Sequence, residues 1–598
     1  RRFDCFDYSV PKELENKIKT GHLVAVYFRN RKIYGIVAGL MQKTAQKTKP
    51  IEALTDIILP KTLLKMADWA SNYYLVSPSL LYKLILPAPT KERGEPKCEI
   101  PQKMLTLAQA ESENVIKNLK NYTGSNLFLY DNNFKETLAV FVKLAQKALE
   151  NKKQILFLVP SPQDINRIAP YLKKIFNDNL VVWHGKLSAG KKFSGWKKIL
   201  SGDSCVVLGT RPACFLPFFN LSLTLIYNHT SADLKQWDQN PRYDARKIAE
   251  KLQELHGAQI VFSDTIPNLE LFNKIKTGEI ASLNASGVSH SFSLVDLKKE
   301  KNFFSFPLYE MIKQGLEKKQ RLVLFVNRQE KDSILICNDC RSVVACPKCE
   351  QPFLVDKNEF LCYHCNIKKP AKAICDKCGG ASLKPLRLGI ESIKKAIEKE
   401  FSESKVEAAT KTKKSSADWD ILLTTDYFWK NILPKIDTNN IYGVAMLDFD
   451  FYLIRPEFNQ KESALEAIYK FLKFSDNRRA LIQTNNPENE IFGEFEKIYE
   501  KELQERKEIN YPPYSRLIKI ICKAKDKRDL DAETNKLYDE LRRAGFNPLP
   551  PFEPFIKKRT KNYLKHIILK ESLDKNLANL RKIIPDEYQI DVDPISIY

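Results

Sequence analysis

Cysteines form the clearest chemical pattern in this sequence. Eight of the 13 cysteines lie within 42 residues, where they make four Cys-x-x-Cys pairs. The pairs are Cys337/Cys340, Cys346/Cys349, Cys362/Cys365 and Cys375/Cys378. A gap of two residues lets both thiolates of a pair face one ion, and two pairs complete a tetrahedral shell of four sulfurs. The sequence therefore predicts two zinc ions per chain, in one small module spanning residues 336–385.

Other uses of these cysteines fit the pattern less well. Disulfides are rare in a reducing cytosol, and iron–sulfur clusters use cysteine runs with different spacing. His364, inside "CYHC", is a further possible ligand, but eight thiolates already fill two shells. We therefore interpret His364 as a surface histidine or a neighbour of the ligands. Zinc alone defines no function, since such modules usually fold a short segment and present it to a partner.

A second stretch, "NLFLYDNNFKETLAVF" (126–141), has the layout of a nucleotide site without its chemistry. The apolar residues 127–129 predict a buried strand, residues 131–133 a polar loop, and a helix is expected to begin near Thr137. A strand, a loop and a helix in this order form the usual phosphate cradle. Yet this loop contains no glycine and no Gly-Lys-Ser/Thr ending. The sequence thus leaves open whether the chain hydrolyses a nucleotide.

The charge of the chain points to a polyanion as partner. Its 598 residues carry a net charge of +23, and the pI is near 9.2. Basic clusters at residues 29–32, 411–414 and 557–561 favour nucleic acid, because Lys and Arg release counterions from phosphates. A generally lysine-rich composition is the alternative explanation. No apolar run is long enough to span a membrane, and the first residues lack the apolar core of a signal peptide. We expect a cytoplasmic protein with no membrane partner.

The periodicity of the chain predicts a multidomain α/β protein. Residues 1–90 are rich in strand patterns, with two strands joined by a basic turn. Strands then alternate with helices, which indicates parallel sheets covered by helices on both faces. We predict the following divisions: 1–90, an N-terminal β-rich domain; 91–104, a linker; 105–275, a first α/β lobe; 276–335 and 386–495, a second lobe interrupted by the cysteine module at 336–385; and 496–598, a C-terminal α+β domain.

The order of these parts resembles the PriA (primosomal protein N′) family, the replication-restart helicases of bacteria. "FDYSVP" (6–11) and "VAVYFRNRKIYGIV" (24–37) resemble the family's N-terminal domain, which captures the 3′ end of a nascent strand. The most specific match is the cysteine module, with "CYHC" for the usual Cys-His-His-Cys. "LIQTNNPEN", "YPPYSRL" and "DVDP" resemble the C-terminal third of the family. The region near 91–104, where the family carries a winged-helix DNA-binding domain, is too short to hold one.

This resemblance implies the rest of the architecture and the partners. The two lobes would be RecA-like, with the P-loop NTPase fold, and the second would carry a binuclear zinc-binding insertion. Cys337, Cys340, Cys375 and Cys378 would bind one zinc, and Cys346, Cys349, Cys362 and Cys365 the other. The protein would bind forked and single-stranded DNA in the bacterial nucleoid. Its protein partners would be primosome components, helicase-loading proteins and single-stranded-DNA-binding protein.

Seven residues are candidates for DNA contact. Asp7 matches the family's 3′-end pocket, although an aspartate beside Tyr8 in a loop would equally cap a turn. The basic candidates are Arg29, Arg31 and Lys32 in the first domain and Lys235 and Arg242 in "KQWDQNPRY". Trp237 in the same segment is a candidate platform for base stacking. Packing inside the lobe is its alternative role.

The nucleotide motifs depart from the family at several places. The family has Gly-Ser-Gly-Lys-Thr where this chain runs from Asp131 to Thr137, and Phe134 stands where phosphate needs bare backbone. Lys135 or Thr137 could replace one family residue, but not both in one register. We therefore interpret them as vestiges of nucleotide binding.

The other ATP motifs are altered as well. The magnesium-binding Asp-Glu-Glu-His of the family reads Tyr-Asn-His-Thr at 227–230, and only Arg478 and Arg479 remain of its Gly-Arg-x-Gly-Arg segment. Losing one charge-stabilising group in phosphoryl transfer costs roughly 10³-fold. We therefore expect no catalytic residue and no ATP or Mg²⁺ as cofactor, while the helicase ancestry keeps enzymatic activity an open question.

The sequence leaves three hypotheses for the function of the protein. The leading hypothesis is a replication-restart primosome protein that binds abandoned or stalled forks and helps reload the replicative helicase, without helicase activity of its own. A second is an active ATP-dependent 3′-to-5′ DNA helicase whose atypical nucleotide site uses Lys135 or Thr137. A third is a zinc-stabilised interaction protein that no longer binds DNA, its charge reflecting only lysine-rich composition.

Overall fold

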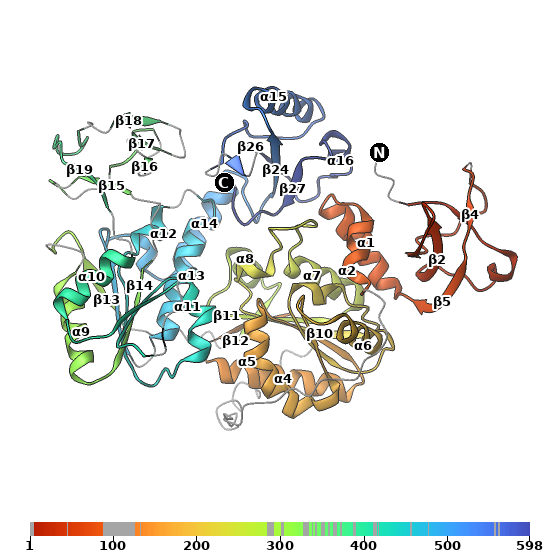
Figure 1. Cartoon of the computed structure of the whole chain (residues 1–598), viewed down its shortest axis with the longest axis horizontal. Helices are drawn as coiled ribbons and strands as arrows, with labels where there is room; N and C mark the ends of the chain where they lie inside the picture. The colour runs from red at the N-terminus through yellow and green to blue at the C-terminus, as the bar shows by residue number, and fades with distance from the viewer. Residues whose placement is uncertain are drawn as a thin grey trace. The chain divides into compact units, whose positions relative to one another are not determined.

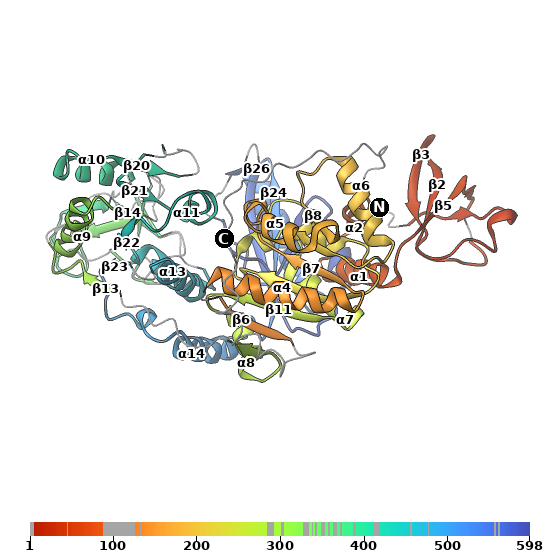
Figure 2. The same ribbon diagram turned by 90° about the horizontal axis from the view of Figure 1, so that it is seen from below.

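A computed structural model describes most of the chain (Figures 1 and 2). The described residues are 5–87 except 45; 126–283 except 132; 292–326 except 301–303; 334–337, 339–340, 344–348, 353–356, 359–362, 367–370 and 374–386; 390–454 except 411–415 and 417; 457–475; 478–554; 558–559; and 562–597. By its internal contacts the chain forms two compact units, Arg1–Ala285 with Arg506–Ile595 and Ser286–Glu505 with Ser596–Tyr598. Among the described helices, none combines the length and apolarity needed to cross a membrane. The predicted linker at 91–104 lies outside the described residues.

The N-terminal domain is a small antiparallel sheet. Its strands are β2 (His22–Phe28), β3 (Arg31–Ile36) and β5 (Ala53–Ile58), in the order β3-β2-β5, while β1 (Tyr8–Ser9) pairs separately with β4 (Lys49–Pro50). Alternate residues of β2, Val24 and Val26, pack into a core with Ile18 and Ile51. Arg29 and Asn30 join β2 to β3 with φ angles of 45° and 61°. Two residues with positive φ give the turn whose twist matches a hairpin, so the predicted basic turn is confirmed.

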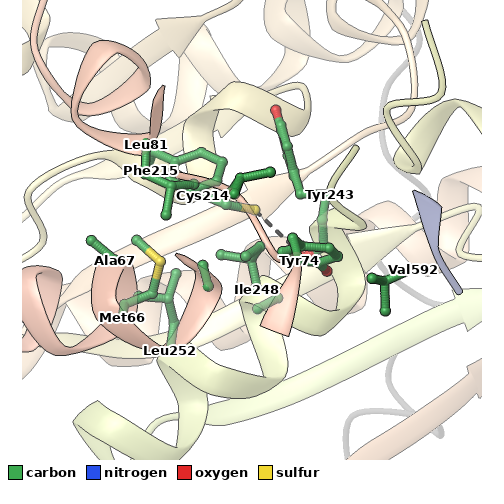
Figure 3. Close-up of a cluster of buried hydrophobic side chains, with 14 of the residues drawn as sticks. Met66, Ala67, Tyr74, Leu81, Cys214, Phe215, Tyr243, Ile248, Leu252 and Val592 are labelled. Carbon is green, nitrogen blue, oxygen red and sulfur yellow. Dashed lines mark hydrogen bonds between the residues drawn. The ribbon is translucent and has the colours of Figure 1, made fainter. Parts of the chain in front are cut away.

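Two helices follow this sheet and join a different core. They are α1 (Lys61–Tyr73) and α2 (Pro78–Ile85). Figure 3 shows Met66, Ala67 and Tyr74 beside Ile248 and Leu252 in one buried cluster. The strand-rich character that we predicted for all of residues 1–90 therefore ends near residue 60. The apolar face of α1 is covered by the first lobe instead.

The first lobe contains a seven-stranded sheet in the order β12-β6-β11-β10-β7-β9-β8, and every neighbouring pair is parallel. Helices lie on both faces: α4 and α5 pack on one core, whereas α6 and α7 pack on the other (Figure 1). The strands are β6 (Leu127–Tyr130), β7 (Gln154–Leu158), β8 (Leu180–Trp183), β9 (Val206–Gly209), β10 (Leu221–Tyr227), β11 (Gln259–Asp264) and β12 (Ala281–Leu283). The helices are α4 (Phe134–Glu150), α5 (Pro162–Phe176), α6 (Ala189–Leu200), α7 (Ala245–His256) and α8 (Leu269–Lys276).

The second lobe repeats this plan with six parallel strands in the order β13-β23-β22-β14-β21-β20. Its core is built from buried apolar residues of the strands and of α9 and α10. The strands are β13 (Ser293–Asp296), β14 (Arg321–Phe325), β20 (Val406–Ala409), β21 (Ile421–Thr424), β22 (Ile441–Met446) and β23 (Arg479–Thr484). The helices are α9 (Phe306–Glu317), α10 (Ile390–Glu400), α11 (Tyr427–Asn431), α12 (Asp450–Ile454), α13 (Gln460–Phe474) and α14 (Phe495–Glu508).

Two antiparallel sheets complete the chain. The cysteine module inserts β15 (Ile334–Cys337), β16 (Leu354–Asp356), β17 (Glu359–Leu361), β18 (Lys368–Pro370) and β19 (Leu383–Leu386) between β14 and α10. The C-terminal domain has β24 (Arg516–Ala524), β25 (Lys558–Arg559), β26 (Asn562–Glu571) and β27 (Gln589–Val592), with α15 (Lys527–Arg543) and α16 (Leu580–Ile583). The predicted fold class is thus confirmed, while the bounds of the seven predicted segments stay predictions.

Candidate functional site

The glycine-free loop lies at the carboxyl edge of the sheet in the first lobe. Register pairs Tyr130 at the end of β6 with Asp264 at the end of β11, and Tyr227 at the end of β10 with Ser263. The backbone N–H of Asp131 donates to the carbonyl of Asp264 over 2.7 Å. Ligands of open parallel sheets bind outside this edge. The loop and the segment 227–230 therefore meet where a nucleotide would bind.

The first turn of α4 is closed by its own side chains. The helix begins at Phe134, three residues earlier than predicted, because the Asn133 side chain caps it by accepting the N–H of Lys135 over 3.0 Å. The hydroxyl of Thr137 donates to Asp131 Oδ1 over 2.7 Å, and both residues are buried. A phosphate needs free donors at a helix N-terminus. Here one of those donors, and the hydroxyl that would bind magnesium, already have partners.

Aromatic rings occupy the space in front of this turn. The guanidinium carbon of Arg167, in α5, lies 4.0 Å from the ring centroid of Phe134. Arg167 also donates to the hydroxyl of Tyr227 over 2.9 Å, and the rings of Phe134 and Tyr227 are 5.8 Å apart. Burial raises the pKa of Tyr227 well above its usual range, so the hydroxyl stays protonated. In this cation–π cluster, the Arg167 guanidinium contacts the two aromatic rings.

The segment 227–230 is likewise bound into the protein. Asn228 adopts a left-handed conformation with φ of 54°. His229 is 1% exposed, and its Nε2 accepts the N–H of Asn268 over 3.2 Å. The N–H and hydroxyl of Thr230 donate to Asp264 Oδ2 over 2.9 and 2.7 Å. These contacts fix His229 and Thr230 within the lobe.

Asp264 is a buried carboxylate that we did not predict at this edge. Its Oδ1 accepts the N–H of Thr265 over 2.8 Å, while Oδ2 accepts from Thr230. Its place at the end of the strand pattern "IVFSD" could have identified it, because ligands of parallel sheets bind outside the carboxyl ends of the strands. The hydrogen bonds from Thr230 and Thr265 direct this carboxylate toward its own turn rather than toward a ligand.

In the second lobe, the arginine pair before "ALIQT" is also engaged. Arg478 donates to the carbonyls of Phe474 over 2.5 Å and Thr438 over 2.9 Å. Arg479 is the first residue of β23, and its guanidinium lies 5.4 Å from the ring centroid of Tyr442. Arg478 therefore holds the end of α13.

The outer cysteine pairs come together as one possible metal centre. The ligand sulfurs of Cys337, Cys340, Cys375 and Cys378 all lie within 4.8 Å of one another. The Cys337–Cys378 and Cys340–Cys375 sulfur distances are 3.6 and 3.7 Å. Four thiolates about 2.3 Å from a zinc ion would lie roughly 3.8 Å apart. This grouping is the one that the family resemblance implies, and its geometry fits zinc; the metal itself stays a prediction.

The surroundings of these sulfurs also suit a metal. The N–H of Gly380 donates to the sulfur of Cys378 over 3.4 Å, which stabilises a thiolate. Gly379 has a φ of 71°, and a Cβ at Gly380 would lie 2.1 Å from Asp339 Oδ2. The positive φ therefore favours glycine at position 379, whereas a larger residue at position 380 would have to displace the Asp339 side chain. Pairing of β15 with β19 brings the two distant knuckles together.

The inner cysteine pairs are described only in part. Cys346 and Cys362 are buried in a small core with Leu335 and Phe353. Their partners, Cys349 and Cys365, and also His364, lie outside the described residues. The second zinc therefore stays a prediction.

The candidates in the first domain surround its hairpin turn. Arg29 is in the turn, with its guanidinium 5.6 Å from the ring centroid of Phe28, and Arg31 and Lys32 begin β3. Lys32 forms an ion pair with Glu52 at 2.9 Å. Asp7 directly precedes β1 and accepts the hydroxyl of Thr44 over 2.5 Å. These residues are accessible, and their contact with DNA stays a prediction.

Two candidates in the first lobe are not at an accessible surface. Lys235 is 0% exposed and pairs with Asp591 at 3.1 Å. Arg242 is 9% exposed and contacts the same carboxylate at 3.3 Å. Charge in "KQWDQNPRY" had suggested phosphate contact, but both cations contact the carboxylate of Asp591, which is distant in the chain. Trp237 between them is 51% exposed, so its stacking role stays a prediction.

Comparison with known proteins found one family model and several similar proteins. Residues 2–87 match the family model of the PriA 3′ DNA-binding domain. The PriA replication restart protein of Helicobacter pylori J99 is 25% identical over 602 residues, covering 97% of this chain and 96% of the relative. That of Rickettsia prowazekii is 26% identical over 655 residues, covering 99% and 98%. A solved structure of Saccharomyces cerevisiae Dbp5 with RNA and ADP BeF3 is 12% identical, covering 74% of this chain and 98% of its own with a TM-score of 0.36.

The N-terminal 3′ DNA-binding domain, the paired parallel α/β lobes and the cysteine module define a helicase-like DNA-binding protein. Relatives of the same name match over nearly their whole length. The chain is similar to PriA replication restart proteins over nearly its whole length, at 25–26% identity.

Proposed function

We propose that this chain is a fork-binding restart protein that does not use ATP. It recognises abandoned or stalled forks through its N-terminal domain and helps reload the replicative helicase. The observation that carries the proposal is the filled carboxyl edge of the first lobe, where Phe134, Arg167 and Tyr227 make one aromatic–guanidinium cluster.

Hydrolysis of ATP requires groups that, at this edge of the sheet, already have hydrogen-bond partners within the protein. A phosphate cradle needs free backbone N–H groups, a lysine, a magnesium-binding hydroxyl and a carboxylate. Here Thr137 is bonded to Asp131, Asp264 accepts from Thr230 and Thr265, and Asn133 caps the helix. Because each missing group costs roughly 10³-fold in phosphoryl transfer, their combined loss supports the absence of ATP turnover.

The DNA-binding half of the proposal has separate support. The match to the 3′ DNA-binding domain covers residues 2–87, and the turn of its hairpin carries Arg29 and Arg31. Lys and Arg at such a turn gain affinity by releasing counterions from the DNA backbone. We assign zinc a structural role, holding the module that presents a surface to primosome and helicase-loading proteins. Single-stranded-DNA-binding protein is a further expected partner in the bacterial cytoplasm.

A paired binding and unwinding assay tests this function. The purified chain is titrated against a labelled fork with a leading-strand 3′ hydroxyl, and against the same fork ending in a 3′ phosphate. We expect the hydroxyl fork to bind about tenfold or more tightly, a difference of roughly 1.4 kcal/mol. Adding ATP and Mg²⁺ should release no strand from either fork. Strand release that requires ATP would establish the active-helicase alternative, whereas absence of fork binding would favour the zinc-stabilised interaction protein.

A further inference from the structure

Two tyrosines stand exposed on one face of the N-terminal hairpin. Tyr27 in β2 is 46% exposed and Tyr34 in β3 is 50% exposed. Register pairs Tyr27 with Lys32 and Ala25 with Tyr34. Residues directly opposite in an antiparallel pair share a face, so Tyr27, Lys32 and Tyr34 project from the same side. Tyr27 and Tyr34 are diagonal neighbours across the two strands, a position in which the backbones of two residues are about 7–8 Å apart.

The fold does not need these rings for its own core. The core of the domain lies on the opposite face, where Val24 and Val26 pack. On the tyrosine face, Leu23 is only 9% exposed and Ile36 packs against the larger buried cluster at the base of the hairpin. On the tyrosine face, the exposed aromatic area therefore lies at the end of the hairpin next to the turn. Grouped exposed rings of this kind usually mark an interaction surface.

We infer that Tyr27 and Tyr34 form a stacking platform for two unpaired bases of single-stranded DNA. The inference rests on the proposed fork binding, and it places the strand on the face of the hairpin that carries Lys32. Aromatic side chains stack on bases of any sequence, and neighbouring cations follow the phosphates.

Charge and geometry favour single-stranded DNA over other occupants. Lys32 shares the face of the two tyrosines, Arg29 and Arg31 lie at the adjoining turn, and residues 2–87 match the family model of the PriA 3′ DNA-binding domain. Paired bases inside a duplex do not offer their faces to a protein side chain without unstacking. Lys32 is paired with Glu52 at 2.9 Å, so this carboxylate offsets part of its charge, and Arg29 and Arg31 at the turn add positive charge at the same end of the hairpin. A strand laid across them would find aromatic surface and positive charge together.

The test measures binding of the full-length chain to labelled oligothymidine, and to the same oligonucleotide with abasic sites in place of its bases. The double variant Tyr27→Ala/Tyr34→Ala should bind oligothymidine about 25-fold or more weakly, at about fivefold for each ring. Tyr27→Phe/Tyr34→Phe keeps both rings and should bind as the wild type does. Ile58→Ala, at a 43% exposed position of the same domain, is the matched control and should change nothing.

Two further readouts separate stacking from charge. The alanine variant and the wild type should bind the abasic oligonucleotide equally well. Loss of stacking should also leave the salt dependence of binding unchanged, whereas Arg31→Ala should reduce its slope by about one. Equal binding of oligothymidine by the wild type and the alanine variant, with fork binding intact, would overturn the platform and leave the proposed function standing. Absence of fork binding in the wild type would overturn both.

Discussion

At the scale of single residues, Thr137 and Asp131 show how the nucleotide edge has become part of the scaffold. The threonine hydroxyl sits in the first helical turn after the loop, as in a phosphate cradle, but it donates to a carboxylate of the loop itself. Both side chains are at most 3% exposed. A buried carboxylate that loses a donor is costly to desolvate. The pair therefore stabilises the loop in a closed form.

Thr137→Val should consequently affect stability rather than turnover. Removing the hydroxyl should lower the free energy of unfolding by about 1–3 kcal/mol, as measured by urea denaturation. Lys135→Ala, in the same helical turn at a partly exposed site, is the comparison. Its free energy of unfolding should stay within about 0.5 kcal/mol of the wild-type value. A fork-stimulated ATPase activity that disappears in either variant would contradict this account.

The cysteine centre allows a second prediction at this scale. Cys375→Ser should lower the zinc content of the purified protein by about one equivalent, because the remaining three sulfurs no longer complete a tetrahedral shell. Metal content is measured by elemental analysis after dialysis. Cys5→Ser, at an exposed cysteine outside the cluster, should keep the wild-type value. Zinc content unchanged by Cys375→Ser would show that the four-sulfur cluster does not bind the metal.

At the scale of elements, α7 and α8 are joined by half-buried ion pairs. Glu270 in α8 contacts Lys247 in α7 and Lys274 in its own helix. Burial alone would favour the neutral acid, but the two ammonium groups lower the pKa of Glu270 from 4.5 to about 2. A carboxyl pKa that is lowered by folding contributes stability above the pKa of the unfolded chain. That contribution is lost as the pH falls through the folded pKa.

We therefore expect the free energy of unfolding to fall between about pH 4.5 and pH 2, and protonation of Glu270 should account for part of that fall. Glu270→Gln should be less stable than the wild type at pH 6 and should lose less stability on acidification. Denaturant midpoints measured across this range provide the test. Glu254 also pairs with a lysine, Lys251, but its side chain is 66% exposed. Glu254→Gln is therefore the control and should follow the wild-type profile. Identical profiles for wild type and Glu270→Gln would contradict the assigned pKa.

The elements also show which features a sequence can predict. Buried strands such as β7 contain continuous apolar runs, here Ile155–Leu158, so the parallel sheets were predictable. The start of α4 was not, because Asn133 as a cap extends the helix over residues with little apolar periodicity. Cysteine spacing indicated a metal centre, since two-residue gaps constrain ligand geometry locally. The contacts of Lys235 could not be predicted, because Asp591 is distant in the chain.

At the scale of the whole molecule, the C-terminal strand holds the first compact unit together. Asp591 of β27 contacts Lys235 and Arg242 of the first lobe, and Asp593 accepts the hydroxyl of Tyr73 in α1 over 2.6 Å. Parts from both ends of the chain therefore meet through buried polar contacts. Such pairs are poor sources of net stability but costly to break.

Asp591→Ala should therefore destabilise this unit strongly. Two buried cations would lose their shared carboxylate, which costs about 3–5 kcal/mol when one partner of a buried pair is removed. Urea denaturation and the rate of limited proteolysis should both report the change. Asp574→Ala, at an exposed position of the same domain, should be nearly neutral. Equal stability of Asp591→Ala and the wild type would mean that Lys235 and Arg242 are not buried together in solution.

The central claim is that this PriA relative binds forks without using ATP, and fork-dependent ATP hydrolysis tests it most directly. The zinc-loaded chain is held at a fork concentration shown by binding to be saturating, and phosphate release is followed with ATP and Mg²⁺. We predict release at the rate of the protein-free control, with and without the fork. Fork-stimulated release that is lost in Thr137→Val or Lys135→Ala would show that the edge formed by Phe134, Arg167 and Tyr227 still opens for a nucleotide, and would contradict the account.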